Sequence, residues 1–334
     1  MRLKIIILFV ISVLYLLWDL VLGKKSFPEI LINKNLIAFV EANSGRGNSS
    51  GNFGDITILD LDSHKKFYVT DDNYYDREPI WSLDGKKIVF LSNRTGRNLS
   101  LAIKGISGPY TICVYDLEKQ KLSLVEIDEP QFKEGIYDRP TWNSDGSSLL
   151  FSYESKIFEY GFISKKVKLF KEFSELGTIS DLILSPNGKY LGIHYDSTNG
   201  AEYRFDRVHF CVYDLEQSRI YRLNRITETW DTEWMPDGNH VLFFGSQDTT
   251  DWHMYQIWDP LTNEIKPFAI PKNVPSRPSF MRVTPSGKIV GLYEDEENET
   301  KSSHAELFIY DNPKLIWPNP GKIIDDIRVL YRIK

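Results

Sequence analysis

The most regular feature of the chain is a short, wholly apolar run that returns after tight turns. Residues 88–91 (Ile-Val-Phe-Leu) and 241–244 (Val-Leu-Phe-Phe) are apolar at every position. A strand with one face in water alternates apolar and polar residues, whereas a continuously apolar strand is covered on both faces. These runs therefore predict strands that lie between neighbouring sheets.

Each of these strands belongs to a predicted hairpin whose turn ends in glycine. The turn glycines are Gly85, Gly146, Gly188, Gly238 and Gly287, at spacings of 61, 42, 50 and 49 residues. Asp, Asn or Ser precedes each glycine, and proline precedes that residue in three of the turns. Proline presets φ near about −65° and glycine accepts a positive φ, which is typical of a type I turn with a bulge. The pattern predicts five β-hairpins.

A second strand pair is expected after the hairpins, and its first strand ends in aspartate at residues 112–116, 210–214, 255–259 and 307–311. Residues 29–69 are interpreted as a first unit, with strands at 29–32, 36–42, 55–60 and 66–70. Six radially arranged sheets would cover both faces of the apolar strands. The predicted fold is an all-β, six-bladed β-propeller of four-stranded antiparallel blades, preceded by an N-terminal hydrophobic signal or anchor helix.

The number of blades and the role of the last strand stay open at the level of sequence. A seven-bladed count is the main alternative, whereas a β-sandwich would expose one face of each sheet and show alternation. Residues 323–332 are expected either to complete the last blade or to close the ring against the first.

The N-terminal segment has its own pattern. Residues 5–18 form an apolar run broken only by Ser12 and Tyr15, and Arg2 and Lys4 precede it. This layout is typical of a secretory signal. A membrane-spanning helix needs roughly 20 apolar residues, and extension to residue 22 includes Asp19. A cleaved signal and a retained membrane tether through residues 5–22 both remain open. We expect residues 1–25 to be this signal or anchor and residues 26–334 to be the propeller, located outside the cytoplasm.

Composition and charge narrow the function classes. The 334 residues are 42% hydrophobic and 26% charged, which suits a large folded core, and the net charge is −6. Nucleic acid is not an expected partner, because sequence-independent binding to it needs a basic face. Cys113 and Cys211 occupy equivalent places in the second and fourth units. One intervening sheet would separate them by roughly 20 Å, beyond the Cα limit of about 7 Å for a disulfide, so both are predicted to be buried free thiols.

The string at residues 79–94, Pro-Ile-Trp-Ser-Leu-Asp-Gly-Lys-Lys-Ile-Val-Phe-Leu-Ser-Asn-Arg, closely resembles the repeat of TolB-type propellers. This repeat also occurs in the propeller domains of prolyl-oligopeptidase-like enzymes. The resemblance covers nearly all of residues 29–311 and is specific for the fold. It implies a periplasmic setting and the binding of a cell-envelope protein, as TolB binds a peptidoglycan-associated lipoprotein. TolB has an α/β domain ahead of its propeller, whereas here the first unit follows the hydrophobic segment directly.

The candidate site follows from the direction of the strands. Within a blade, the turns between strands one and two and between strands three and four are expected to be tight, and the other connections long. Because strands alternate in direction, all long connections emerge on one rim, where recognition residues are commonly held by a rigid scaffold. Aromatic and charged residues recur there, at the start of the innermost strands and beside the channel: Tyr75, Asp76, Arg77, Tyr137, Asp138, Arg139, Trp230, Asp231 and Arg277.

Two hypotheses account for these residues, and both can hold at once. In the first, Asp and Arg side chains pair across neighbouring blades and keep the ring closed. In the second, the aromatic and arginine side chains engage a peptide, glycan or protein, since Tyr, Trp and Arg are enriched at binding hot spots.

Catalytic and metal-binding motifs give weak signals. Residues 47–51 match Gly-x-Ser-x-Gly but lie in a Gly/Ser/Asn-rich loop, without the strand and helix that such a nucleophile needs. The six histidines are scattered, and the acidic run at 294–299 lacks the ligand order of a calcium loop. We therefore expect no catalytic residue, no metal and no cofactor.

The predicted function is a monomeric, non-enzymatic scaffold that binds a protein or peptide ligand at the loop rim and channel mouth. The alternatives are a metal-dependent hydrolase or lyase and a glycan-binding protein, the latter suggested by an aromatic content of 13%. The ligands of the metal would be the channel-lining carboxylates, such as Asp76, Asp138, Asp181 and Asp231.

Overall fold

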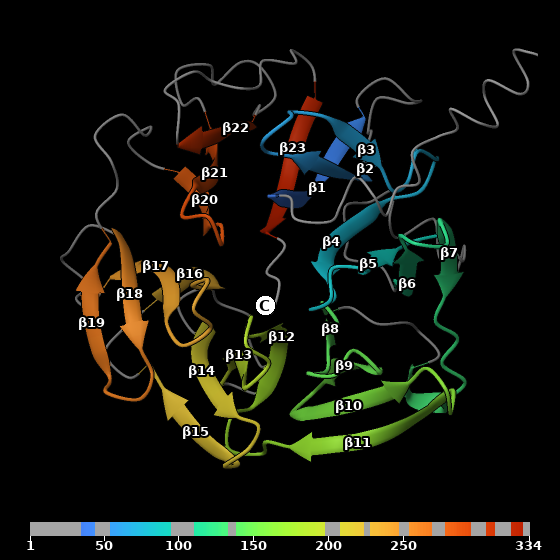
Figure 1. The fold of residues 1–334 in the computed structure, drawn as a ribbon. Helices are drawn as coiled ribbons and strands as arrows, with labels where there is room; N and C mark the ends of the chain where they lie inside the picture. The colour runs from blue at the N-terminus through green and yellow to red at the C-terminus, as the bar shows by residue number, and fades with distance from the viewer. Residues whose placement is uncertain are drawn as a thin grey trace, which may run out of the picture.

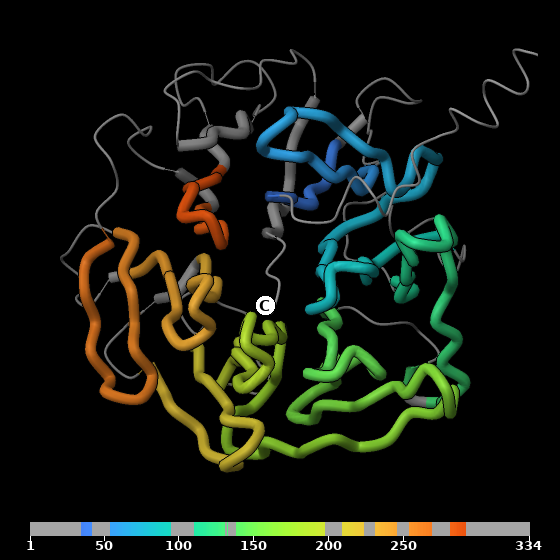
Figure 2. Tube along the Cα trace, viewed as in Figure 1, coloured from blue at the N-terminus to red at the C-terminus, as the bar shows by residue number. Residues whose placement is uncertain are grey.

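The strands form small antiparallel sheets arranged around a central axis, as Figure 1 shows. The structure is a computed structural model, and it describes residues 35–43, 54–94, 110–132, 138–197, 208–223, 228–246, 254–268, 278–294, 305–310 and 322–329. Figure 2 shows that the chain passes from each sheet to the next around the ring in sequence order. The molecule is therefore an all-β propeller, as predicted.

Five of the sheets have four strands. In the first, the order is β23 (Lys322–Val329), β1 (Leu36–Asn43), β2 (Gly54–Asp60) and β3 (Lys66–Tyr68). The second contains β4 (Asp76–Trp81), β5 (Lys87–Ser92), β6 (Thr111–Asp116) and β7 (Lys121–Leu124). The third contains β8 (Thr141–Trp142), β9 (Ser148–Tyr153), β10 (Lys156–Gly161) and β11 (Lys166–Glu172), and a short 3-10 turn at Pro130–Phe132 precedes it.

The remaining sheets continue the same plan. The fourth contains β12 (Thr178–Leu184), β13 (Tyr190–Asp196), β14 (Val208–Asp214) and β15 (Arg219–Arg222). The fifth contains β16 (Glu228–Trp234), β17 (Val241–Ser246), β18 (Met254–Asp259) and β19 (Glu264–Pro267). A sixth sheet has three strands in the part of the chain that the structure describes: β20 (Pro278–Val283), β21 (Ile289–Glu294) and β22 (Ala305–Tyr310).

The first sheet is completed by a strand from the far end of the sequence. β23 pairs antiparallel with β1, with Ile37 opposite Val329 and Asn43 opposite Lys322. Two alternatives were open for residues 323–332, and the structure shows the second of them: this segment closes the ring against the first blade. In the interpretation of residues 29–69 as the first unit, residues 29–32 are the strand before β1, but the place beside β1 is taken by β23, because β2 lies on the other side of β1. Residues 29–32 themselves lie outside the described residues.

The predicted hairpin turns are confirmed. All five turn glycines have φ between 68° and 82°, and in the first the Gly85 N–H donates to the Ser82 carbonyl at 2.8 Å. The recurrent aspartate has a local role at the next turn. In β14, Asp214 Oδ1 accepts the N–H groups of Glu216 and Gln217 at 2.9 and 2.7 Å, so the aspartate satisfies the donors of the tight turn that follows it.

One connection differs from the expectation of long loops between the second and third strands. In the third sheet, β9 and β10 are joined by residues 154 and 155 alone, and Glu154 has φ 55°. The register pairs Lys156 directly with Tyr153. The third blade therefore has no long loop of this kind on the loop rim.

Tryptophan side chains connect neighbouring blades through the core. The Trp142 Nε1–H of the third blade donates to the Ile80 carbonyl of the second at 3.2 Å. The Trp234 Nε1–H of the fifth donates to the Ile183 carbonyl of the fourth at 3.0 Å. Both indoles are buried, so the tryptophan of the repeat supplies apolar area and one hydrogen bond to each of these interfaces.

The cysteines are placed as predicted. Cys113 in β6 and Cys211 in β14 are buried free thiols in two different blades. Burial raises the pKa of each thiol to about 12, which makes both of them unreactive at neutral pH.

Among the described residues, no helix is long and apolar enough to cross a membrane. The predicted signal or anchor at residues 5–22 lies outside the described residues, as do the Gly-x-Ser-x-Gly match at 47–51 and residues 295–299 of the acidic run.

Candidate functional site

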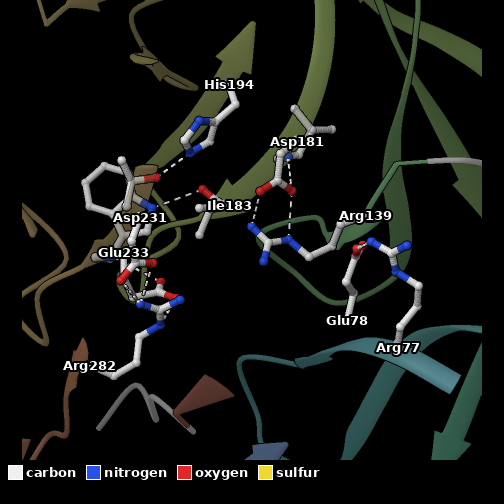
Figure 3. Close-up of polar contacts among 12 residues, drawn as sticks. Arg77, Glu78, Arg139, Asp181, Ile183, His194, Asp231, Glu233 and Arg282 are labelled. Carbon is white, nitrogen blue, oxygen red and sulfur yellow. Dashed lines mark hydrogen bonds and ion pairs between the residues drawn. The ribbon is translucent and has the colours of Figure 1, made fainter. Parts of the chain in front are cut away.

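The innermost strands share an irregularity near their beginning. The register shifts between Arg77 and Ile80 in β4, between Ile179 and Asp181 in β12, and between Thr229 and Asp231 in β16. A β-bulge adds one residue to a strand and re-aims the side chains around it. Figure 3 shows the result, in which polar side chains from several inner strands point toward one another. We refer to this region as the channel mouth.

Arg139 and Asp181 form an ion pair between the third and fourth blades. Arg139 Nε donates to Asp181 Oδ1 at 2.7 Å, and a second guanidinium nitrogen donates to Oδ2 (Figure 3). The Leu182 N–H donates to the same carboxylate at 2.8 Å. A bidentate pair of this kind fixes both distance and orientation, so it is the type of contact that the ring-closing hypothesis describes.

Arg282 forms a second junction, between the fifth blade and the sheet of β20, β21 and β22. One of its terminal nitrogens, Nη1, lies 2.7 Å from both carboxylate oxygens of Asp231. Its Nε lies 3.2 Å from Glu233 Oε2. Asp231 also accepts hydrogen bonds from the Tyr255 hydroxyl at 3.1 Å and the Met281 N–H at 3.2 Å. Arg282 is 1% exposed, so this charge cluster lies in the interior.

Arg77 has a different kind of partner. Its guanidinium pairs with Glu78, the next residue of the same chain (Figure 3). The guanidinium also stands 5.3 Å from the ring centre of Tyr110. Glu78 has φ 56°, consistent with the bulge at this point of β4. The Arg77 side chain is 31% exposed. Glu78 and Tyr110 both belong to the second blade, so these two contacts do not join neighbouring blades as the Arg139 and Arg282 pairs do.

Asp138 is a partly buried carboxyl beside these pairs. The Ser152 hydroxyl donates to its Oδ2 at 3.2 Å. Burial raises the pKa of Asp138 to about 7, and this hydrogen bond opposes the shift. The carboxylates of Asp181 and Glu78 push the pKa of Asp138 further up, which brings its titration close to neutral pH.

His194 lies across the next interface. Its Nε2 hydrogen-bonds Thr232 Oγ1 of the fifth blade (Figure 3). Burial lowers the pKa of His194 to about 3, so the ring is neutral under ordinary conditions. The contact is a neutral link between the fourth and fifth blades.

The other predicted site residues do not take part in these pairs, or they lie outside the residues that the structure describes. Tyr75 packs beside Tyr110, with ring centres 6.3 Å apart, in the core between the second and third blades. Asp76 is buried and both its oxygens are held by Arg94, at 3.0 and 2.7 Å. Trp230 lies in β16 but its side chain is not described, and Tyr137 and Arg277 lie outside the described residues.

Sequence reasoning missed Glu78, His194, Glu233 and Arg282, and named Asp181 only as a potential metal ligand. The sequence contains a signal for two of them, Glu233 and Arg282. Ile80, Ile183, Glu233 and Arg282 occupy the same position, five residues before the turn glycines 85, 188, 238 and 287. A charged residue in a strand that is covered on both faces needs a partner, so a Glu and an Arg at this position of consecutive blades predict a pair.

Tight turns meet one another at the opposite end of the channel. A Cβ placed on Gly188 would lie 3.3 Å from Ser144 Cβ and 3.4 Å from Leu83 Cδ1, so turns of the second, third and fourth blades are in contact. Asn187 Nδ2 donates to the Gly238 carbonyl of the fifth blade at 2.9 Å. The tight turns of the second to fifth blades are therefore in contact with one another at this end.

The carboxylates named as possible metal ligands are not grouped. Asp76 is held by Arg94, Asp181 by Arg139 and Asp231 by Arg282. Among the described residues, no group of three or more His, Cys, Asp and Glu is positioned to hold a metal ion. The residues described at the channel mouth therefore do not fit a metal centre.

Comparison with known proteins places the fold. No protein-family model and no curated protein matches the chain. The crystal structure of TolB from Acinetobacter baumannii superposes with a TM-score of 0.61 and 17% identity, covering 89% of this chain and 66% of that one. An oligogalacturonate lyase in complex with manganese gives a TM-score of 0.53 and 13% identity, over 81% of this chain and 70% of that one. A putative TolB from Agrobacterium tumefaciens gives 0.50 and 14%, over 89% of each chain.

These likenesses define the class of protein as a β-propeller. Within that class the chain has the TolB-type propeller fold, so the resemblance inferred from the repeat at residues 79–94 is confirmed for the fold. The chain spans about two thirds of the length of the Acinetobacter TolB, with 66% of that protein covered.

Proposed function

We propose that this protein is an exported propeller with six blades that acts as a non-enzymatic scaffold and binds a protein or peptide of the cell envelope at the channel mouth. The observation that carries the proposal is the convergence of Arg77, Glu78, Asp138, Arg139 and Asp181 from three successive blades. The sheet of β20, β21 and β22 is counted as the sixth blade.

The arrangement suits recognition because its charges are fixed in advance. Arg139 is oriented by Asp181 through two hydrogen bonds, and Arg77 is held against Glu78 and the Tyr110 ring. Arg139 is 6% exposed and supports the mouth from within, so the arginine that a partner meets is Arg77, which is 31% exposed. Because Arg77 is already held in place, it loses little conformational freedom on binding, which favours affinity. Arginine beside aromatic rings is also the composition of protein-binding hot spots.

The proposed location outside the cytoplasm rests on two observations. The apolar run at residues 5–18 follows basic residues, as in an export signal. The TolB-type fold supports the same compartment through the family resemblance. We further propose that the chain is a monomer and needs no cofactor.

The binding proposal is tested by capture from a cell-envelope extract on the immobilised full chain. We expect a partner that is retained by the wild type and lost with Arg77→Ala, while the melting temperature stays unchanged. Lys86→Ala is the matched control, because Lys86 is an exposed residue beside the tight turn at Gly85, where it pairs with Glu118. Equal retention by the wild type and both variants would refute binding at the channel mouth.

A metal-dependent lyase is the second candidate, favoured by the likeness to the oligogalacturonate lyase in complex with manganese. The separate arginine partners of Asp76, Asp181 and Asp231 argue against it. Metal analysis of the purified protein after dialysis separates the two functions, since a retained stoichiometric divalent ion would support the lyase. A glycan array tests the third possibility, binding of a carbohydrate.

A further inference from the structure

The outer edge of the third blade differs from the other outer edges. The outermost strands β3, β7, β15 and β19 have 3, 4, 4 and 4 residues, whereas β11 has 7. Propellers normally protect their outer edges by keeping these strands short. In Figure 1, β11 runs along the periphery of the ring. Among the described outermost strands, β11 presents the longest row of backbone groups that no neighbouring strand pairs.

The two faces of β11 carry different chemistry. The register sets Lys168 opposite Glu159 and Lys171 opposite Ile157, with a bulge between them. Side chains alternate between faces along a strand. The bulge adds one residue between Lys168 and Lys171, so these two side chains lie on the same face although their spacing is odd. Lys166, Lys168 and Lys171 therefore share one face, and Val167 and Leu169 share the other.

Apolar side chains are unusually exposed along this edge. Leu169 is 51% exposed and Phe170, the extra residue of the bulge, is 37% exposed. Ile163 in the turn that leads into β11 is 97% exposed. Large apolar side chains gathered on a free edge are typical of a surface that another chain covers.

The charge of the edge indicates what would cover it. The chain as a whole has a net charge of −6, yet three lysines lie on one face of β11. Lys168 pairs with Glu159 at 2.9 Å and is 72% exposed, and Lys171 lies over the rings of Phe173 and Tyr213 at 5.4 and 5.3 Å. In the described part of the chain, the Lys166 ammonium has no carboxylate partner. An added strand with carboxylates on this face would be complementary.

We propose that β11 is a strand-addition site for an extended acidic peptide of a partner protein. The peptide adds a fifth strand to the third blade, with main-chain hydrogen bonds supplying affinity and side chains supplying selectivity. Its acidic residues occupy alternate positions above Lys166, Lys168 and Lys171. Its apolar residues occupy the intervening positions and cover Val167 and Leu169.

The same lysines disfavour the most obvious competitor, a second copy of this chain. Two antiparallel β11 strands set Lys168 opposite itself in the register centred on Lys168, and Lys166 opposite Lys168 in the register centred on Val167, and like charges on directly opposed residues are destabilising. An acidic strand instead can place a carboxylate opposite each lysine.

The test uses the full chain and short synthetic peptides, with affinity measured by calorimetry. We expect a peptide of alternating glutamate and valine to bind. The corresponding lysine and valine peptide, and a peptide with glutamates and valines in separate blocks, should bind at least about tenfold more weakly, equivalent to about 1.4 kcal/mol. Equal affinity for the three peptides would overturn the proposal.

A charge reversal locates the site. The double variant Lys166→Glu/Lys168→Glu should weaken binding of the glutamate peptide at least about tenfold and create binding of the lysine peptide. The matched control is Lys121→Glu/Lys266→Glu, which makes the same charge change on the exposed edges of β7 and β19 and should leave binding unchanged. An equal loss in the control would overturn the location. If the double variant does not fold, Lys166→Gln alone provides the comparison.

Backbone pairing is tested with N-methylated peptides. Methylation of the amides along one edge of the glutamate peptide should abolish binding, whereas methylation along the other edge should not. Binding that survives both would show side-chain contact without strand addition. Arg77→Ala should not affect the peptide, which separates this surface from the channel mouth. A dimer of the wild type that Lys166→Glu disperses would overturn the choice of partner.

Discussion

Arg282 and Arg77 are both arginines of inner strands, but their surroundings give them different roles. Arg282 is 1% exposed and joins Asp231 and Glu233 across the boundary of two blades. Arg77 is 31% exposed and pairs with the adjacent Glu78. The comparison teaches that a charge pair stabilises the ring only where it links two blades and is removed from water. A local and partly exposed pair leaves its arginine available to a ligand.

The largest effect is expected for Arg282→Ala. Its loss leaves two buried carboxylates without their cation, and breaking a buried pair in this way costs about 3–5 kcal/mol. Urea unfolding of the purified chain measures the change in the free energy of unfolding. Arg219→Ala, on the exposed strand β15, is the control and should change it by less than about 1 kcal/mol. A similar small loss for Arg282→Ala would remove the basis of the comparison.

The loss in the free energy of unfolding for Arg139→Ala should lie between the losses for Arg282→Ala and Arg77→Ala. Asp181 would lose a bidentate partner that comes from the preceding blade, and an unsatisfied, partly buried group of this kind costs about 2–3 kcal/mol. The same unfolding experiment measures it, and Arg139→Lys should recover part of the loss because one charge contact survives. Stability equal to the wild type would assign Arg139 to ligand binding alone.

The raised pKa of the Asp138 carboxyl predicts that the stability of the folded protein depends on pH. Burial raises its pKa to about 7, while an unfolded Asp titrates near about 3.9. The folded state thus holds an extra proton between these values, and stability from this group is lost as pH rises from about 4 to about 7. Asp138→Asn keeps an acceptor for Ser152 and removes the titration. It should match the wild type near about pH 4 and exceed it by about 1–2 kcal/mol near about pH 8.

The pH dependence of stability that we expect from His194 has the opposite sign, so His194 serves as a control for this experiment. Burial lowers its pKa to about 3, so the unfolded state binds the extra proton and stability from this group is lost as pH falls below about 6.5. His194→Gln should reduce the loss of stability on acidification and leave the alkaline branch unchanged. An alkaline branch that persists in Asp138→Asn would show that another group causes it.

The smallest effect on stability is expected for Arg77→Ala. Exposed and local ion pairs contribute about 0–1 kcal/mol, so the melting temperature should hardly change while ligand capture is lost. A loss as large as that of Arg139→Ala would mean that Arg77 supports the ring, and the proposed division between structural and ligand-binding arginines would fail.

Much of the fold followed from local signals. Gly85 and its four equivalents mark turns because they need a positive φ, and Asp214 marks a turn because its side chain satisfies the donors that follow. The channel mouth was found only in part. Asp138 and Arg139 were identified from their recurrence. Asp76 and Tyr75 have the same sequence setting, but Asp76 is held by Arg94 within the second blade and Tyr75 packs in the core between the second and third blades. The bulge at Glu78 adds one residue to β4 and shifts which side chain faces the channel.

The sequence by itself determined the strands, the tight turns and which strands are covered on both faces, because each of these leaves a pattern within a few residues of the chain. Tertiary structure alone decided that β23 closes the first blade, that Arg139 meets Asp181 at a separation of 42 residues, and that Arg282 meets Asp231 at 51. Those partners depend on the angle between blades and on where each bulge re-aims its strand. Burial then makes each pairing obligatory, since a charge removed from water needs its counter-charge.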